Sequence, residues 1–209
     1  MSERVYVWDK FVRFFHWSLV ALFALSYLTG DEESELHIYS GYGVLALVLA
    51  RIAWGFIGSR YARFSDFVRA PATIIQHARE MAAGKPKRYL GHNPLGGIMV
   101  VALLLTLLAV TFSGLKLYAV EEGKGPLAQQ SQMTLINSAM ADDDDDEEHE
   151  GHHGRGEDAG EEFWEEVHET AVNLMLFLIL LHVAGVVVSS RLENESLVKA
   201  MLTGYKKRD

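Results

Sequence analysis

Apolar residues along this chain gather in four long blocks, which stretches of charged and loop-forming residues separate. The blocks cover residues 11–29, 36–57, 95–117 and 167–190. Each block reaches the roughly 20 residues that a helix needs to cross about 30 Å of hydrocarbon. Because helices satisfy their own backbone polar groups in lipid, the pattern predicts an all-α fold, an integral membrane four-helix transmembrane bundle.

The first block also has the length of a secretory signal, but its polar residues argue against cleavage. Arg13, His16 and Trp17 lie in its first turns, and no small-residue cleavage pattern follows it. We therefore expect this block to remain as a transmembrane helix. Taken alone, it could equally be a plain, uncleaved membrane anchor.

Charged residues divide the loops into two kinds, and this division predicts the orientation in the membrane. Basic residues dominate the N-terminus, residues 59–94 and the C-terminal tail, whereas residues 31–35 and 120–166 are mostly acidic. Loops rich in Lys and Arg stay in the cytoplasm. We therefore expect a multi-pass membrane protein, with both termini in the cytoplasm and both acidic loops outside.

The basic loop carries two local signals. Residues 72–83 are expected to form a short helix on the cytoplasmic surface, and Asn93-Pro94 to initiate the third long helix. His77 and His92, also in this loop, are expected to be ordinary surface histidines.

The acidic loop, residues 121–166, is predicted to be a long, disordered periplasmic segment, because its composition is too polar to pack. Its low-complexity tract, residues 142–158, contains His149, His152 and His153. These imidazoles could bind a divalent metal with the neighbouring carboxylates, or the tract could be a solvated tether.

The absence of cysteine limits which redox cofactors the chain can hold. It excludes covalent c-type haem, all-cysteine iron–sulfur clusters and structural disulfides. Any redox cofactor must therefore be held by histidine, by methionine or through non-covalent contacts.

Four histidines lie within the apolar blocks at two depths. His168 and His182 are fourteen residues apart, a separation of about 21 Å along one stripe of a helix. His16 lies at the cytoplasmic end of the first helix and His37 at the outer end of the second. Depth therefore pairs His16 with His182 and His37 with His168, and two facing imidazoles around a planar macrocycle indicate a haem site. The third helix has no histidine and is expected to pack around the outside.

Each of these polar residues also has a plainer interpretation. A single intramembrane histidine can simply hydrogen-bond to a neighbouring helix. Arg51, on the same face as His37, could pair with a propionate of the inner haem. Alternatively, Arg51 could face lipid headgroups, with Trp54 as an interfacial anchor.

The motifs resemble those of the bacterial cytochrome b561 and hydrogenase-type cytochrome b subunits. The resemblance rests on residues 7–17 (VWDKFVRFFHW), residues 37–41 (HIYSG) with Arg51 and Trp54, residues 55–64, residues 91–97 (GHNPLGG), His168, His182 and residues 193–204. The resemblance covers nearly the whole chain. The sequence differs from the family in its long acidic loop, residues 121–166, which compact family members lack.

This resemblance implies a protein of the bacterial inner (plasma) membrane that holds two b haems, with His16, His37, His168 and His182 as the iron ligands. It also implies electron transfer between the quinone pool and a periplasmic cytochrome c or dehydrogenase subunit, with the quinone or quinol near the inner haem. The bilayer is the other expected partner, and no nucleic acid is expected. Two alternatives are a self-sufficient superoxide:quinone oxidoreductase, which a cationic outer surface would favour, and a metal-handling membrane protein.

Overall fold

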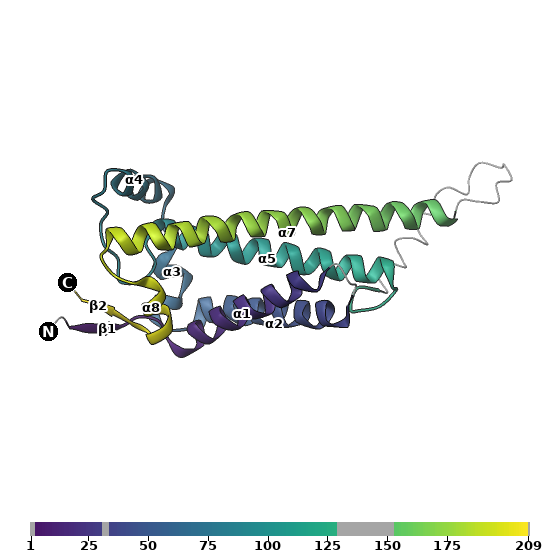
Figure 1. Cartoon of the computed structure of the whole chain (residues 1–209), viewed down its shortest axis with the longest axis horizontal. Coiled ribbons are helices and arrows are strands. Elements are labelled where there is room, and N and C mark those ends of the chain that lie inside the picture. Colours follow the sequence, from purple (N-terminus) through teal and green to yellow (C-terminus); the bar gives the residue numbers. More distant parts are fainter. Residues whose placement is uncertain (1–2, 31–33, 129–152, 209) are drawn as a thin grey trace. The chain divides into compact units, whose positions relative to one another are not determined.

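Four long helices dominate the structure, a computed structural model that describes residues 3–30, 34–128 and 153–208 (Figure 1). They are α1 (Lys10–Leu28), α2 (Glu35–Ile57), α5 (Pro94–Glu121) and α7 (His153–Leu192). All four are long and apolar enough to cross a membrane. They correspond to the four predicted blocks.

Six short elements complete the described chain. They are β1 (Arg4–Tyr6), η2 (Arg60–Ala62), α3 (Phe64–Phe67), α4 (Pro71–Ala82), α8 (Leu197–Thr203) and β2 (Tyr205–Lys207). The chain divides into two compact units. Unit 1 comprises Met1–Leu107 and Leu176–Asp209, and unit 2 comprises Leu108–Met175, so α5 and α7 contribute to both.

Helices α1 and α2 of unit 1 form an antiparallel pair (Figure 1). At one end, Asp9 caps α1 by accepting from the Val12 amide at 2.8 Å, and its other oxygen accepts from Trp54 Nε1 at 3.1 Å and from the Ser59 hydroxyl. At the other end, the His37 ring bonds to the Ser26 carbonyl. These bonds fix the register of the two helices.

A small core lies at the end of unit 1 that carries the chain termini. Five buried residues form it: Val7, Trp8, Val12, Ala62 and Ala200. Beside it, β1 and β2 pair antiparallel, which brings the N-terminal and C-terminal segments together. The sequence patterns did not predict this sheet, because three-residue strands are too short for a periodic signal.

Gly204 makes this junction possible. It ends α8 in the left-handed conformation, with φ 90°, and its carbonyl accepts from the amides of Val7 and Trp8 at 2.8 and 3.1 Å. A Cβ at this position would lie 2.6 Å from the Tyr6 ring and 2.8 Å from the Trp8 carbonyl. Only glycine therefore suits both the backbone conformation and the close approach.

The basic loop is more ordered than its composition suggests. Helix α4 begins at Pro71, close to the predicted position, and α5 begins at Pro94 with the Asn93 side chain capping the Gly96 amide at 2.7 Å. The expectation of a surface His77 was wrong. Its ring is 2% exposed and packs against Tyr89. Burial lowers the pKa of His77, although the negative charges of Glu80 and Glu193 act to raise it.

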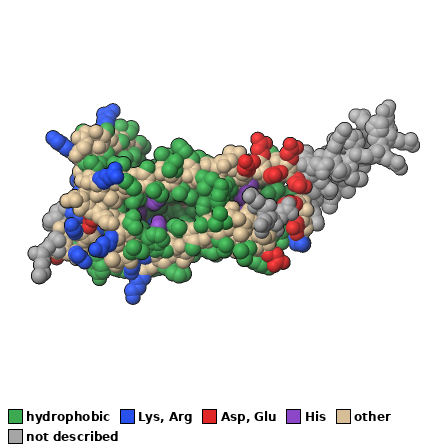
Figure 2. Space-filling view, in the orientation of Figure 1, with side chains coloured by type: hydrophobic (Ala, Val, Ile, Leu, Met, Phe, Trp, Pro, Cys, Tyr) green, Lys and Arg blue, Asp and Glu red, His purple; other side chains and the backbone are tan. Residues whose placement is uncertain are grey.

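Two ion pairs with largely buried carboxylates tie the C-terminal tail to this loop. Lys206 pairs with Glu193 at 3.4 Å and donates to the Tyr89 carbonyl, while Arg88 pairs with Glu195 at 2.8 Å. Figure 2 shows Lys and Arg side chains gathered over the end of unit 1 that carries α4 and the two strands. The predicted concentration of basic charge at one end therefore persists in the folded unit.

Unit 2 joins the C-terminal part of α5 to the N-terminal part of α7. Trp164 contacts Phe112 with ring centroids 6.0 Å apart, and the Lys116 ammonium lies 6.0 Å from the centre of the Trp164 ring. Helix α7 begins at His153 rather than near residue 167, and so extends beyond the apolar block. The prediction of a loop over residues 121–166 was therefore wrong for residues 153–166, which are helical, and residues 129–152 lie outside the described residues.

Candidate functional site

His16 and His182 face each other within unit 1. His16 lies two turns into α1, whose start the Asp9 cap sets, and His182 lies ten residues before the end of α7. Their ring centroids are 6.5 Å apart, with an angle of 52° between the ring planes. An iron bound to one nitrogen of each ring at about 2 Å needs centroids about 6 Å apart, so this separation suits a bis-histidine site.

The polar atoms of this histidine pair are incompletely satisfied by the protein. His16 Nδ1 is buried and has no hydrogen-bond partner among the described residues. Buried polar atoms are normally paired, so this nitrogen has capacity for a partner that the described residues do not supply. Together with the ring separation of 6.5 Å, it fits a group bound by the two histidines.

Arg51 is buried in the same unit, at 2% exposure. Its Nη2 donates to the Ala62 carbonyl at 3.1 Å, and its guanidinium lies 5.6 Å from the centre of the Phe64 ring. Its Nη1 is buried without a hydrogen-bond partner in the part of the chain that the structure describes. The interpretation in which Arg51 faces lipid headgroups is therefore wrong, and the free N–H can serve an anionic ligand.

His92 lies beside this group and is not a simple surface residue. Its ring packs between Trp8 and Phe67, with centroid distances of 4.6 and 4.7 Å, and its Nδ1 is buried. Burial first, and then the positive charges of Arg51, Lys206 and His182, lower the pKa of His92 to about 3. It is therefore neutral at physiological pH and can act as an uncharged donor or acceptor.

His37, at the first turn of α2, is held by the end of α1. Its Nδ1 lies 2.8 Å from the Ser26 carbonyl and 3.3 Å from the Ser26 hydroxyl. A carbonyl oxygen only accepts, so Nδ1 donates and carries the proton. The lone pair of the neutral ring is then on Nε2, the form that can bind a metal.

His168 is held in a similar way within unit 2. Its Nδ1 lies 3.0 Å from the hydroxyl of Ser113, a residue of α5 that is 1% exposed. Gly114 allows this approach, because a Cβ there would lie 3.0 Å from His168 Cε1. The third helix, which has no histidine of its own, thus contacts one of the four predicted histidines through Ser113.

The structure thus brings together two of the four predicted histidines, His16 and His182, which are one of the pairs that depth predicts. His37 and His168 belong to different units, and each has its own anchor. Sequence reasoning missed the anchors, Ser26 and Ser113. Serines are common in membrane helices, and nothing in the local pattern distinguishes these two.

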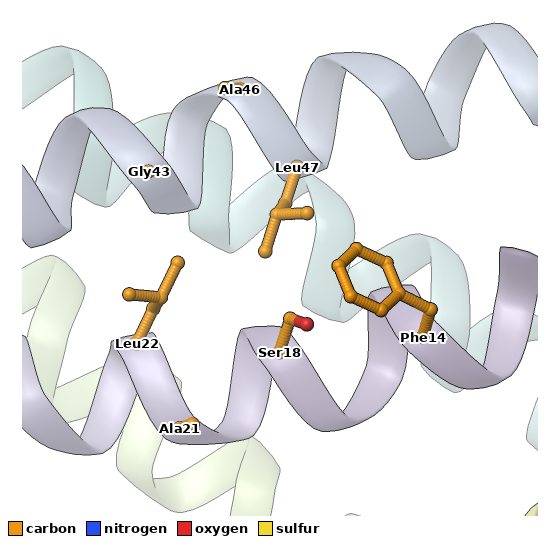
Figure 3. Close-up of a pocket in the computed structure, with 7 residues that line it drawn as sticks. All are labelled: Phe14, Ser18, Ala21, Leu22, Gly43, Ala46 and Leu47. Carbon is orange, nitrogen blue, oxygen red and sulfur yellow. The ribbon is translucent and has the colours of Figure 1, made fainter.

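A further pocket lies within unit 1, away from the histidines. Its volume is about 550 Å³. Figure 3 shows the residues of α1 and α2 that line it: Phe14, Ser18, Ala21, Leu22, Gly43, Ala46 and Leu47. It contains no titratable side chain. Within the described ranges, no group of three or more His, Cys, Asp or Glu residues is placed to hold a metal ion. The side chains of His149, His152 and His153 lie outside what the structure describes.

Comparison with known proteins gives a consistent result. A family model described as prokaryotic cytochrome b561 matches residues 7–204. Similar proteins include the probable Ni/Fe-hydrogenase B-type cytochrome subunits of Azotobacter chroococcum mcd 1, Bradyrhizobium diazoefficiens and Rhizobium leguminosarum bv. viciae. The first is 27% identical, over 60% of this chain and 64% of its own length. The others are each 28% identical, over 58% and 59% of this chain and 60% and 62% of theirs.

The chain spans less than two thirds of the length of these relatives. No solved structure matches it.

Proposed function

Because the chain belongs to the prokaryotic cytochrome b561 family, and is thus a multi-pass membrane cytochrome of the b type, we propose that it carries electrons across the membrane. The proposed donor or acceptor on one side is the quinone pool, and on the other side a periplasmic redox protein. Two haem b groups would supply reversible one-electron chemistry. The residues of this chain would hold the two haems at two depths in the membrane and determine the polarity of their surroundings.

The observation that carries this proposal is the facing pair of His16 and His182. Their separation of 6.5 Å suits an iron ligated from both sides. We propose that they hold an inner haem, on the cytoplasmic side. His37 and His168, whose Nδ1 atoms both have acceptors, would hold the outer haem. Their assignment rests on depth in the membrane, and for His37 also on the tautomer that the Ser26 carbonyl selects.

Arg51 is proposed to bind a propionate of the inner haem. Its buried Nη1 has a hydrogen to donate and no acceptor in the described parts of the chain. Leaving a charged N–H buried and unpaired costs free energy, which a carboxylate acceptor would recover. His92, neutral and next to this charge, has an unpaired Nδ1 that could serve the same acceptor.

The proposed orientation has the basic end of unit 1 in the cytoplasm and the acidic loops in the periplasm. The relatives are named as subunits of a Ni/Fe hydrogenase. For this chain we propose a dehydrogenase subunit of that kind, or a cytochrome c, as the periplasmic partner. The quinone site is proposed near the inner haem.

A superoxide:quinone oxidoreductase gains no support from the described outer segments. Such an enzyme needs a cationic surface to attract its anionic substrate. Lys124 pairs with Glu122 at 2.6 Å, and Lys116 lies against Trp164. The first described turns of α7 are acidic and exposed at Glu161, Glu162, Glu165 and Glu166.

The test is to count haems and assign their ligands in the purified full-length protein. We expect two non-covalent haems per chain in a pyridine haemochrome assay, all extractable with acid acetone. His16→Ala and His182→Ala should lose one and the same spectral component, and His37→Ala and His168→Ala the other. The matched control is His77→Ala, which removes a buried histidine outside the four spans and should retain both components.

A colourless preparation would contradict the proposed function, and a single haem per chain would contradict the count. The pairing is wrong if His16→Ala and His37→Ala abolish the same component. Quinol-driven reduction of the wild-type haems in membranes then tests the proposed link to the quinone pool.

A further inference from the structure

The Ser113 hydroxyl lies within hydrogen-bond distance of two acceptor-capable groups, the Val110 carbonyl and the His168 ring. The hydroxyl donates to the Val110 carbonyl, one turn back on α5, at 3.0 Å. A serine hydroxyl has one hydrogen. With that hydrogen on the Val110 carbonyl, Ser113 Oγ is left to accept from His168 Nδ1 across their contact of 3.0 Å. His168 carries its proton on Nδ1, and its lone pair is on Nε2.

The surroundings of Ser113 strengthen its hydrogen bond with His168. Ser113 is 1% exposed, so water does not compete for its oxygen. An oxygen that donates one hydrogen bond becomes a better acceptor for another, and the low dielectric of the interior strengthens both bonds. Gly114 leaves the ring close to α5, where a Cβ would be only 3.0 Å from Cε1.

We infer that Ser113 is a positioning residue that tunes the outer haem through His168, an inference that rests on the proposed function. An acceptor on Nδ1–H fixes the ring orientation and increases the basicity of Nε2. A more basic ligand stabilises the ferric state over the ferrous state. The hydroxyl of Ser113 therefore lowers the midpoint potential of the haem that His168 binds.

His16 of the inner pair provides the contrast. Its Nδ1 has no hydrogen-bond acceptor among the described residues. The proposed outer ligands both have one, a backbone carbonyl for His37 and a side-chain hydroxyl for His168. Of these two acceptors, only the Ser113 hydroxyl can be removed by substitution.

The experiment compares Ser113→Ala, Ser113→Thr and the wild type as haem-loaded, full-length protein. Thr keeps the hydroxyl and its bond to the preceding turn, whereas Ala removes the acceptor. Thr106→Val is the matched control, since it removes another buried hydroxyl two turns earlier on α5. The readouts are haem content, a redox titration resolved by component, and the low-spin EPR spectrum, which reports the orientation of the axial rings.

We expect Ser113→Ala to raise the midpoint potential of the component that His168→Ala loses, and to alter its EPR signal. The other component should not move. Ser113→Thr and Thr106→Val should both titrate like the wild type. If Ala releases the outer haem altogether, Thr must retain it.

The inference is wrong if Ser113→Ala keeps both haems with unchanged potentials and EPR spectrum, or if the shift falls on the other component. It is also wrong if Thr behaves as Ala does, because the hydroxyl would then have no part in the effect. A wild-type protein without haem would contradict the proposed function itself, whereas these results contradict only the role of Ser113.

Discussion

At the scale of single residues, the buried guanidinium of Arg51 is the feature with the clearest electrostatic consequence. A cation that stays buried at 2% exposure with one N–H unpaired requires an anionic partner. If that partner is a haem propionate, the charge of Arg51 stabilises the reduced haem relative to the oxidised haem. The residue would then raise the potential of the inner haem.

We therefore predict that Arg51→Gln lowers the midpoint potential of the inner component by on the order of 50 mV. The outer component should keep its potential. Arg60→Gln is the control, because this arginine of the same unit is 75% exposed and its charge is screened by solvent. Potentiometric titration of both variants is the measurement, and an unchanged inner potential in Arg51→Gln would remove the proposed contact.

At the scale of elements, Asp9 decides how α1 begins and how it joins α2. One carboxylate oxygen caps the Val12 amide, and the other accepts from Trp54 and Ser59 at the far end of α2. Burial raises the pKa of Asp9, but the hydrogen bonds from Ser59, Val12, Trp54 and Phe11 outweigh it, and the net pKa is lowered. The folded state therefore favours the ionised carboxylate.

We predict that Asp9→Ala destabilises the protein by about 2–3 kcal/mol, the loss of a cap and of two further hydrogen bonds. Asp9→Asn should lose less, since asparagine still caps a helix but its amide cannot accept from both Trp54 and Ser59. Ser196→Ala, which removes only the cap of α8, is the control for capping alone. Thermal unfolding in detergent at pH 7 measures these differences.

The pH dependence follows from the sign of the shift. Because the pKa of Asp9 is lower in the folded state, its stabilisation is complete above the unfolded pKa of about 4 and is lost as pH falls through the folded pKa. The difference between wild type and Asp9→Ala should therefore be constant from pH 7 to pH 5 and shrink only in stronger acid. A difference that already disappears at pH 6 would show that the carboxylate is not the cause.

At the scale of the whole molecule, basic residues are concentrated in residues 59–94 and the C-terminal tail, and acidic residues in residues 120–166. The acidic tract, residues 142–158, ends within the first turns of α7, and exposed acidic residues continue along that helix to Glu169. His168 is adjacent to this surface. A negative surface there would attract a basic redox partner and raise its encounter rate more than its final affinity.

We predict that replacing residues 142–150 with a Gly/Ser segment of equal length slows electron transfer to a basic cytochrome c at low salt. The replacement leaves α7 intact. The rate should also lose most of its salt dependence, because surface attraction is screened over about 8 Å at physiological ionic strength. Stopped-flow reoxidation of the haems at low and high salt is the measurement.

The control exchanges the same acidic residues for Asn and Gln, which removes charge but keeps length and polarity. It should behave like the Gly/Ser variant. Unchanged rates and unchanged salt dependence in both variants would leave the tract as a tether or a metal-binding segment.

Local sequence determined the parts of this protein that depend on one helix at a time. Continuous apolar blocks were enough to predict four membrane-length helices, because length and hydropathy decide whether a segment can cross lipid. The position of His16 near the start of one helix and of His182 near the end of another was enough to predict their matched depth, and the structure places their rings 6.5 Å apart.

Tertiary structure decided the parts that depend on contacts between segments distant in the chain. Burial of Arg51 and His77, the hydroxyl of Ser113 beside His168, and the pairing of β1 with β2 all arise where one element meets another. The extension of α7 to His153 goes with contacts between Trp164 and α5 beyond the apolar block. The periodicity of the sequence indicates which face of a helix is apolar. Which atoms lie opposite a given side chain depends on how the helices pack.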